Sequence, residues 1–393
     1  MRKVWIVLAV CLSCAMASSA QAGREATIMA ADGVLLKATF TPAAKPGPGV
    51  ILFHQCNRDR KAWNTLVPQL TAAGFHVLTF DYRGYGESGG ERHLNLSAND
   101  RIAAVANKWP GDIDAAFNFL LAQRGVDKNR IGAAGASCGV NQSIQLALLH
   151  PQVKSLVLLS GSTDTAGRQF LRTADGLPIF AAASDDDAGA VPLMRWILAF
   201  SHNPQNKFAQ FKAAGHGTEM FAVEKGLEPM IVEWFEKTLR NAPAKLPVTS
   251  SSAVKPSQQE EFWSLLEESG GAARAMQYYE EMKKRDPSVV LFPEFAVNAL
   301  GYERLQDGKA AAAVEIFKIN VAAYPASPNV YDSLGDAYVA TGKRELAIEA
   351  SRKTIQMLDT TPGLDEQFRK LLRESAEGKL RQLGAPLAAP PKQ

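Results

Sequence analysis

A glycine-flanked serine is the feature of this sequence that points most directly to chemistry. Gly135-Ala136-Ser137-Cys138-Gly139 has the pattern G-x-S-x-G, and it joins the apolar stretch Arg130–Gly135 to the helical pattern of Cys138–His150. A serine in such a strand-to-helix turn sits at a strained backbone angle that exposes its hydroxyl, and small neighbours let the backbone pass close. The placement predicts Ser137 as a nucleophile, with a purely structural turn serine as the alternative.

A serine hydroxyl is a poor nucleophile at neutral pH, so the site needs a base and an acid that orients the base. For a serine in this kind of turn, the acid and then the histidine follow along the chain. His216 lies in the glycine-containing segment Ala213–Thr218 and is the predicted base. The acid is one of Asp185, Asp186 and Asp187, because only one of the three carboxylates can usually reach the imidazole.

Acyl transfer also requires donors for a developing oxyanion, usually two backbone amides. One is predicted at Cys138, directly after the nucleophile, and we assign the other to Gln55 in the loop that follows an earlier strand. His54 of the same loop is predicted to buttress it, because one base is enough for the reaction.

The elements that must position these residues alternate along the chain. The predicted strands are a hairpin of Ile28–Ala31 and Val34–Phe40, then Val50–His54, Phe75–Phe80, Arg130–Gly135, Leu156–Ser160, Pro178–Ala183 and Asn206–Phe211. The predicted helices are Lys61–Ala73, Ile113–Arg124, Cys138–His150, Val191–Phe200 and a long amphipathic helix over Met220–Arg240. This alternation predicts an α/β fold, a doubly wound and mostly parallel sheet with helices on both faces.

The composition changes after this region. Residues 243–257 contain three prolines and a Thr-Ser-Ser-Ser run, which predicts a linker. In residues 258–383, Leu300-Gly301 recurs at Leu334-Gly335, 34 residues later. That spacing resembles the tetratricopeptide repeat, so an all-α helical-repeat domain of three helical hairpins is predicted. The proline-containing tail 384–393 is predicted to be disordered.

Four motifs together resemble the α/β-hydrolase superfamily, and within it the dienelactone-hydrolase-like branch. They are the Gly135–Gly139 motif, the run from Asp81 to Ser88, the His54-Gln55 loop and Gly215-His216-Gly217. The resemblance covers about Glu25–Arg240 and implies a catalytic domain over residues 23–242, in which Asp81 and Arg83 are scaffold residues.

The resemblance also bears on the acid and the nucleophile. The family's spacing from the proline at the strand start favours Asp187, with Asp186 and then Asp185 as alternatives. Dienelactone hydrolases proper use cysteine as the nucleophile. Here Ser137 stands at the matching position, so a thiol mechanism through Cys138 is a minor alternative.

The first 22 residues have the pattern of a secretory signal peptide. Arg2 and Lys3 precede an apolar run to Met16, and Ala20-Gln21-Ala22 fits a cleavage site. Nothing comparable follows, so no membrane span is predicted after cleavage; an uncleaved anchor is the alternative. We therefore expect an exported protein, periplasmic or secreted. The formal net charge is only +3, with no basic tail, which argues against nucleic acid as the partner.

Cleavage would leave Cys56 and Cys138, too few for a disulfide framework. Each adjoins or supplies an oxyanion amide, so the two should lie near each other. A bridge between them is chemically possible in an oxidising compartment. The favoured interpretation is nevertheless that each packs as a small buried residue behind the site.

These inferences predict a serine hydrolase that cleaves an ester, thioester or lactone through an acyl-enzyme, taking a small-molecule or acyl substrate. No metal-ligand cluster, phosphate-binding loop or nicotinamide fingerprint accompanies the motifs, so no cofactor is implied. The alternatives are a prolyl-oligopeptidase-like serine peptidase, or an interaction protein whose repeats bind a protein or peptide while the hydrolase is a scaffold. Gly161–Leu177 is too short for a helical cap. The site should therefore be open, with specificity set by Gly89–Trp109 and by the helical module.

Overall fold

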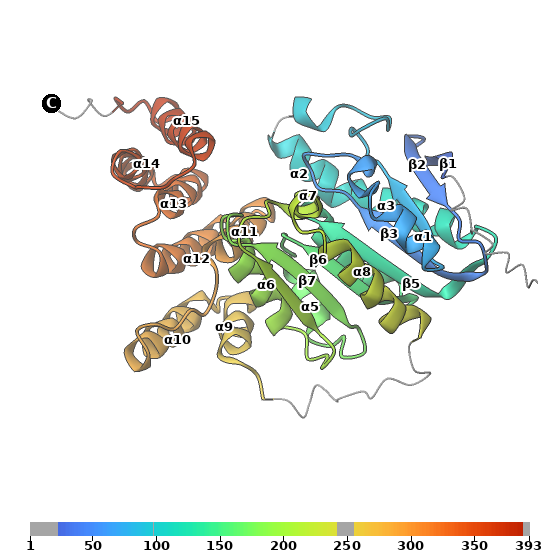
Figure 1. The fold of residues 1–393 in the computed structure, drawn as a ribbon. Helices are drawn as coiled ribbons and strands as arrows, with labels where there is room; N and C mark the ends of the chain where they lie inside the picture. Colours follow the sequence, from blue (N-terminus) through green and yellow to red (C-terminus); the bar gives the residue numbers. More distant parts are fainter. Residues whose placement is uncertain (1–22, 97, 242–254, 388–393) are drawn as a thin grey trace, which may run out of the picture.

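The computed structural model of the chain describes residues 23–96, 98–241 and 255–387 (Figure 1). The predicted signal peptide 1–22, residues 243–254 of the predicted linker and residues 388–393 of the predicted tail lie outside the described residues. An α/β unit comes first, and a unit made only of helices follows it.

The α/β unit is built on one eight-stranded sheet. Its strands are β1 (Arg24–Met29), β2 (Leu35–Thr41), β3 (Gly47–Phe53), β4 (His76–Phe80), β5 (Val126–Ala136), β6 (Val153–Leu159), β7 (Ile179–Ser184) and β8 (Lys207–Phe211). The order is β1-β2-β4-β3-β5-β6-β7-β8. The β1–β2 and β2–β4 pairs are antiparallel, and the other pairs are parallel. The predicted mostly parallel sheet is confirmed.

The sheet is covered on both faces because its strands alternate between two apolar cores. In β3, Ile51 and Phe53 enter one core, whereas Val50 and Leu52 enter the other. Helices α3 (Trp109–Leu121), α4 (Cys138–Leu149) and α6 (Ala190–Ala199) cover the first face. Helices α1 (Val67–Ala72) and α8 (Leu227–Phe235) cover the second. Burial on both sides explains the nearly continuous apolar runs of the central strands.

Some helices differ from the prediction. α2 (Ala98–Asn107) lies in the predicted loop Gly89–Trp109, and α5 (Thr165–Leu171) lies in the short gap after β6. The long helix predicted over Met220–Arg240 is divided into α7 (Met220–Val223), α8 and a π-helical turn, Glu236–Arg240. The division occurs because Glu224 leaves the helical region, with φ −94° and ψ 84°.

Within residues 255–387 the structure describes seven helices. They are α9 (Gln258–Glu267), α10 (Ala272–Arg285), α11 (Glu294–Gln306), α12 (Ala310–Ala323), α13 (Pro328–Ala340), α14 (Arg344–Leu358) and α15 (Glu366–Gln382). Consecutive helices pack as the pairs α9–α10, α11–α12 and α13–α14. Gly301 faces the Phe317 ring so closely that a Cβ there would lie 2.3 Å from it, which explains a glycine at this repeat position. The tetratricopeptide assignment itself stays a prediction.

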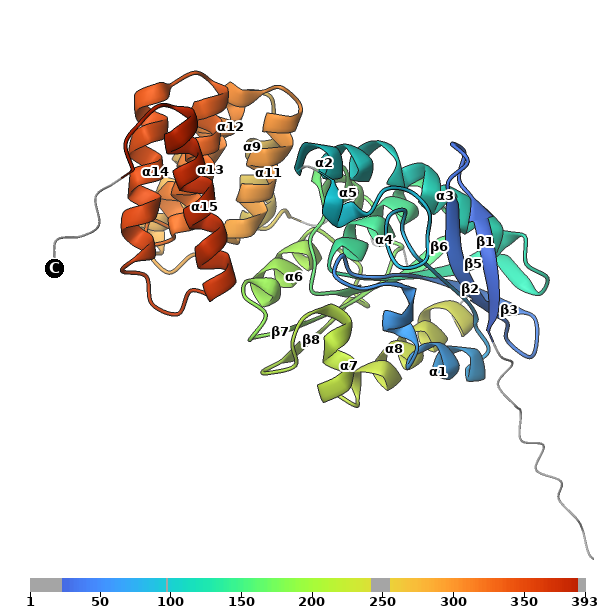
Figure 2. The same ribbon diagram turned by 90° about the horizontal axis from the view of Figure 1, so that it is seen from above.

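The helical unit packs against the end of the sheet that carries α5 and α6, far from β1 and β2 (Figure 2). One apolar core runs through both units, since Trp196 and Phe200 pack on Trp263 of α9. Arg168 is fully buried at this junction and pairs with Glu267 at 2.8 Å. The two units therefore form one packed body. None of the helices in the described ranges is both long enough and apolar enough to cross a membrane.

Candidate active site

Ser137 lies in the turn between β5 and α4, and its backbone is strained there, with φ 54° and ψ −118°. The neighbouring glycines make this turn possible. A Cβ on Gly135 would lie 1.9 Å from the Gly139 carbonyl oxygen, and one on Gly139 would lie 2.4 Å from the Phe53 carbonyl oxygen. Such strain in a non-glycine residue persists only where the surroundings hold it, and it is concentrated at functional sites. The hydroxyl is half-buried at the wall of a cavity.

His216 follows β8 and lines the same cavity as Ser137. Its Nδ1 lies 2.7 Å from Oδ2 of Asp187, which comes just after β7. The hydrogen bond to Asp187 raises the pKa of His216, although partial burial opposes this shift. Among the described residues no hydrogen bond joins Ser137 to His216; such bonds are often long without a substrate. The structure thus brings all three predicted triad residues to one cavity.

The other two aspartates have different partners. Asp186 accepts hydrogen bonds from the Ser184 hydroxyl and from the amides of Ala214 and Gly215, both at 3.2 Å. Asp185 accepts one from the Gln210 amide at 2.6 Å. Asp186 therefore fixes the loop before His216, and Asp185 lies at the surface. Of the three alternatives that the sequence leaves open, only Asp187 contacts the imidazole.

The two predicted oxyanion donors lie in the loop after β3 and at the first residue of α4. Among the hydrogen bonds of the described residues, the amides of Gln55 and Cys138 donate none. Cys138 lines the cavity of Ser137, whereas Gln55 is fully buried and is not one of the residues lining that cavity. A disulfide joins Cys56 to Cys138, with their Cα atoms 5.9 Å apart. The favoured expectation of two separate buried thiols is therefore wrong. Both cysteines are only half-buried, at the rim of the site, and the bridge ties one donor loop to the other.

The Gln55 side chain has a role that the sequence does not predict. Its Oε1 accepts hydrogen bonds from the amide and the hydroxyl of Thr218, at 2.8 and 2.9 Å. Its Nε2 donates to Asn57 at 2.8 Å. Because Thr218 lies two residues after His216, this buried amide connects the oxyanion loop to the loop of the base. No sequence pattern marks such a contact, since the two residues are 163 positions apart.

His54 points into the fold. Its Nε2 accepts a hydrogen bond from the Tyr82 amide at 3.1 Å, so Nδ1 carries the proton and donates to the Gln55 carbonyl at 2.8 Å. Burial lowers the pKa of His54 and keeps the ring neutral. These contacts match the buttressing role expected of it.

The scaffold residues lie beside this loop. Asp81 is fully buried and accepts hydrogen bonds from the Arg60 guanidinium at 2.6 Å and from the Glu87 amide at 2.8 Å. Arg83 makes ion pairs with Asp112 at 2.6 Å and with Asp32 at 2.8 Å. Both side chains hold the turn after β4 and stand outside the cavity that contains Ser137.

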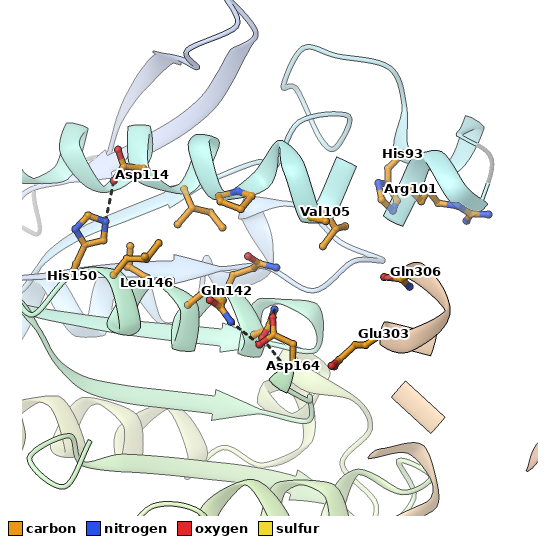
Figure 3. Close-up of a pocket in the computed structure, with 16 residues that line it drawn as sticks. His93, Arg101, Val105, Asp114, Gln142, Leu146, His150, Asp164, Glu303 and Gln306 are labelled. Carbon is orange, nitrogen blue, oxygen red and sulfur yellow. Dashed lines mark hydrogen bonds and ion pairs between the residues drawn. The ribbon is translucent and has the colours of Figure 1, made fainter. Parts of the chain in front are cut away.

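Two adjoining cavities surround the nucleophile. The one that contains Ser137 and His216 has a volume of about 560 Å³, and its neighbour has about 630 Å³. Figure 3 shows the second, where Glu303 and Gln306 of α11 approach from the helical unit toward Val105 of α2 and Asp164. The site is therefore open but walled by both units.

Comparisons with known proteins agree with this description. Residues 48–184 match the family model described as alpha/beta hydrolase fold. An uncharacterized protein of Mycobacterium tuberculosis is 33% identical over 147 residues, which are 37% of this chain and 48% of that protein. An uncharacterized 31.7 kDa protein of Escherichia coli is 36% identical over 114 residues, 28% of this chain and 36% of that protein. The chain thus spans about half, or less, of the length of the curated relatives it matches.

Among solved structures, an esterase of Pyrococcus furiosus is 17% identical with a TM-score of 0.47, and the match covers 56% of this chain and 92% of that one. A dienelactone hydrolase of Anabaena variabilis is 17% identical with a TM-score of 0.43, covering 56% and 100%. The family match over residues 48–184, the sheet order and the strained serine turn together show that the N-terminal unit of this chain has the α/β-hydrolase fold.

Proposed function

We propose that this hydrolase is a cofactor-independent serine hydrolase that cleaves an ester, thioester or lactone through an acyl-enzyme. Ser137 is the nucleophile, His216 the base and Asp187 the orienting acid. The observation that carries the proposal is the 2.7 Å contact between His216 and Asp187 beside a serine held at positive φ in the same cavity.

In the first half of the reaction, His216 takes the proton of Ser137 Oγ as this oxygen bonds to the substrate's carbonyl carbon. The amides of Gln55 and Cys138 donate hydrogen bonds to the resulting oxyanion. Removal of a single such donor typically lowers kcat by about 10²- to 10³-fold. Collapse breaks the bond to the leaving group, which departs with the proton from His216. Water then attacks the acyl carbon while His216 takes its proton. The bond between this carbon and Ser137 Oγ breaks, His216 returns the proton to Oγ, and the carboxylic acid is released.

We further propose that the chain is exported. The sequence of residues 1–22 supports this, and so does the Cys56–Cys138 bridge, because disulfides persist in oxidising compartments. Partner binding by the helical repeats stays a prediction.

The experiment is labelling with a fluorophosphonate, followed by assays on p-nitrophenyl esters and on a set of peptides. We expect Ser137→Ala to abolish labelling and to lower kcat by about 10⁴- to 10⁶-fold, since triad residues act as a unit. Ser288→Ala, which removes an exposed hydroxyl far from the cavity, is the matched control.

Turnover of peptides but not of esters would favour the peptidase alternative. Wild-type protein that neither labels nor turns over any of these compounds would leave the hydrolase domain as a scaffold. A Ser137→Ala variant that keeps more than about a tenth of the turnover would contradict the nucleophile assignment.

A further inference from the structure

The cavity beside Ser137 is completed by a helix from outside the hydrolase domain. Phe295, Ala299 and Glu303 of α11 line it together with Ser137 and His216. The three residues are four positions apart, so they lie on one face of the helix. The Phe295 ring lies against Gly189, where an added Cβ would be only 3.0 Å from it.

The opposite walls come from the α/β unit. Val105 of α2 and Leu193 of α6 give apolar surface, and Asn141 and Gln142 of α4 lie beside Ser137. Five residues line both cavities, namely Val105, Asn141, Gln142, Asp164 and Glu303. The two cavities therefore form one groove, which leads from Ser137 past α11 and α2 and then between α3 and α4.

Two carboxylates, those of Asp164 and Glu303, line both cavities. Figure 3 shows both of them in the second cavity. Asp164 accepts hydrogen bonds from Asn141 and Gln145, at 3.2 and 2.7 Å. Glu303 accepts one from the Thr165 hydroxyl at 2.5 Å, and Arg168 is 3.8 Å away. Burial raises the pKa of Glu303, and the nearby Asp164 adds to this effect. A negatively charged substrate group here would meet two carboxylates. The nearest cation, Arg168, is already paired with Glu303 and Glu267, and Arg101 lines the second cavity.

The wall formed by α11 is fixed by contacts between the helical unit and the α/β unit. Arg168 donates to Glu267 at 2.8 Å, and Arg172 donates to the other oxygen of the same carboxylate at 3.1 Å. The Arg168 guanidinium also lies 4.9 Å from the ring centre of Trp263. Since α9 is fixed in this way and shares its core with α11, the groove is preformed.

We propose that α11 of the helical unit selects the substrate of the hydrolase. One side of the scissile ester, an uncharged group with an apolar portion of several carbon atoms, lies in the groove between α11 and α2, and anionic groups are disfavoured where Glu303 and Asp164 meet. This inference rests on the proposed serine hydrolase function and adds the substrate class and the residues that determine it.

The test of the wall uses Ala299→Trp in the full chain, because an indole at this half-exposed position would fill the groove without entering the core. Two ester series are assayed, one with acyl chains from acetate to octanoate and one with alcohol chains from ethyl to octyl acetate. We expect kcat/KM to fall at least about tenfold for the eight-carbon member of one series and less than about threefold for its shortest member. Ala312→Trp places the same ring on the exposed surface of α12 and is the control.

The test of charge compares a neutral ester with a p-nitrophenyl hemi-ester of a dicarboxylic acid of equal length. Wild type should prefer the neutral ester, and Glu303→Gln, which keeps an acceptor for Thr165, should reduce that preference about threefold or more. Circular dichroism and thermal unfolding verify that each variant is folded.

The outcomes separate the two proposals. If wild type is neither labelled nor active on any ester, the proposed function fails and this inference falls with it. If wild type is active but Ala299→Trp changes every chain length equally or not at all, or if Glu303→Gln leaves the charge preference unchanged, the role of α11 is overturned and the proposed function stands. Should Ala299→Trp not fold, Ala299→Leu, with a smaller side chain, replaces it in the same comparison.

Discussion

At the scale of single residues, the contact between His216 and Asp187 decides which aspartate matters. Asp187→Asn should lower kcat by about 10⁴-fold, because the imidazole loses the carboxylate that fixes its tautomer. Asp185→Asn removes only a charge at the surface and keeps an acceptor for Gln210, so it should change kcat little. Asp186→Asn should act mainly on stability, because its partners are backbone groups before His216. A large loss of kcat confined to Asp186→Asn would contradict the assignment.

The same contact predicts the pH dependence. The hydrogen bond that the imidazole donates to Asp187 raises the pKa of His216 above its ordinary value of 6.5. A base must be neutral, so activity should already fall as the pH decreases through a value above 6.5. In Asp187→Asn this support is lost, and the pKa of His216 should decrease. NMR titration of the His216 ring in both proteins measures the shift, and an unchanged pKa would show that the contact does not exist in solution.

The individual site residues differ in whether they can be predicted from the sequence. Ser137 and His216 are predictable because strained turns and glycine-flanked loops leave a local pattern. The three aspartates are adjacent and identical in type, so the family's spacing favours Asp187 without excluding the others, and only the three-dimensional register of β7 against β8 shows which of them contacts His216. The Gln55 side chain and Phe295 leave no sequence signal, because each acts through contacts with residues distant in the chain.

At the scale of elements, the bridge between Cys56 and Cys138 links the β3 loop to the start of α4. Cys56→Ala removes the bridge and retains both proposed donor amides. We expect the free energy of unfolding to fall by about 2–4 kcal/mol, because the bridge closes a loop across 82 positions. Because the two donors then move independently, kcat should fall about tenfold, less than after complete loss of one donor.

Urea unfolding and ester kinetics measure the two effects. Treating the wild type with dithiothreitol should reproduce the loss in kcat, whereas the Cys56→Ala variant should not respond to it. Two titratable thiols in the denatured, unreduced protein that begins at Gly23, and so lacks Cys11 and Cys14, would eliminate the bridge and both expectations with it.

Helices and strands can be predicted from the sequence where burial gives a segment a regular apolar pattern. All eight strands are predicted, because central strands buried on both faces appear as apolar runs. The helices α2 and α5 are missed, although α2 is as long as the predicted α6. Their burial depends on packing against α3, α4 and the helical unit, which periodicity within one segment does not reveal.

At the scale of the whole molecule, the junction between the two units predicts how the protein unfolds. Arg168 is fully buried, Glu267 is 4% exposed, and the core around Trp263 belongs to both units. Because the two units share this core and this ion pair, neither can unfold without exposing the buried residues of the other, and the wild type should unfold in one calorimetric transition. Arg168→Ala leaves the Glu267 carboxylate with a weaker partner, and the free energy of unfolding should fall by about 3–5 kcal/mol.

The Arg168→Ala substitution at the junction should also change activity, because the junction positions a wall of the active-site groove. When α9 loosens, α11 and its Phe295 lose their fixed position against Gly189, so long esters should be turned over more slowly than in wild type while fluorophosphonate labelling of Ser137 continues. Lys318→Ala, which removes an exposed ion pair with Glu315 in α12, is the matched control and should change stability by less than about 0.5 kcal/mol. Two separate transitions in wild type, or an Arg168→Ala variant as stable as the control, would mean that the units fold independently and that the wall of the groove is not held by this junction.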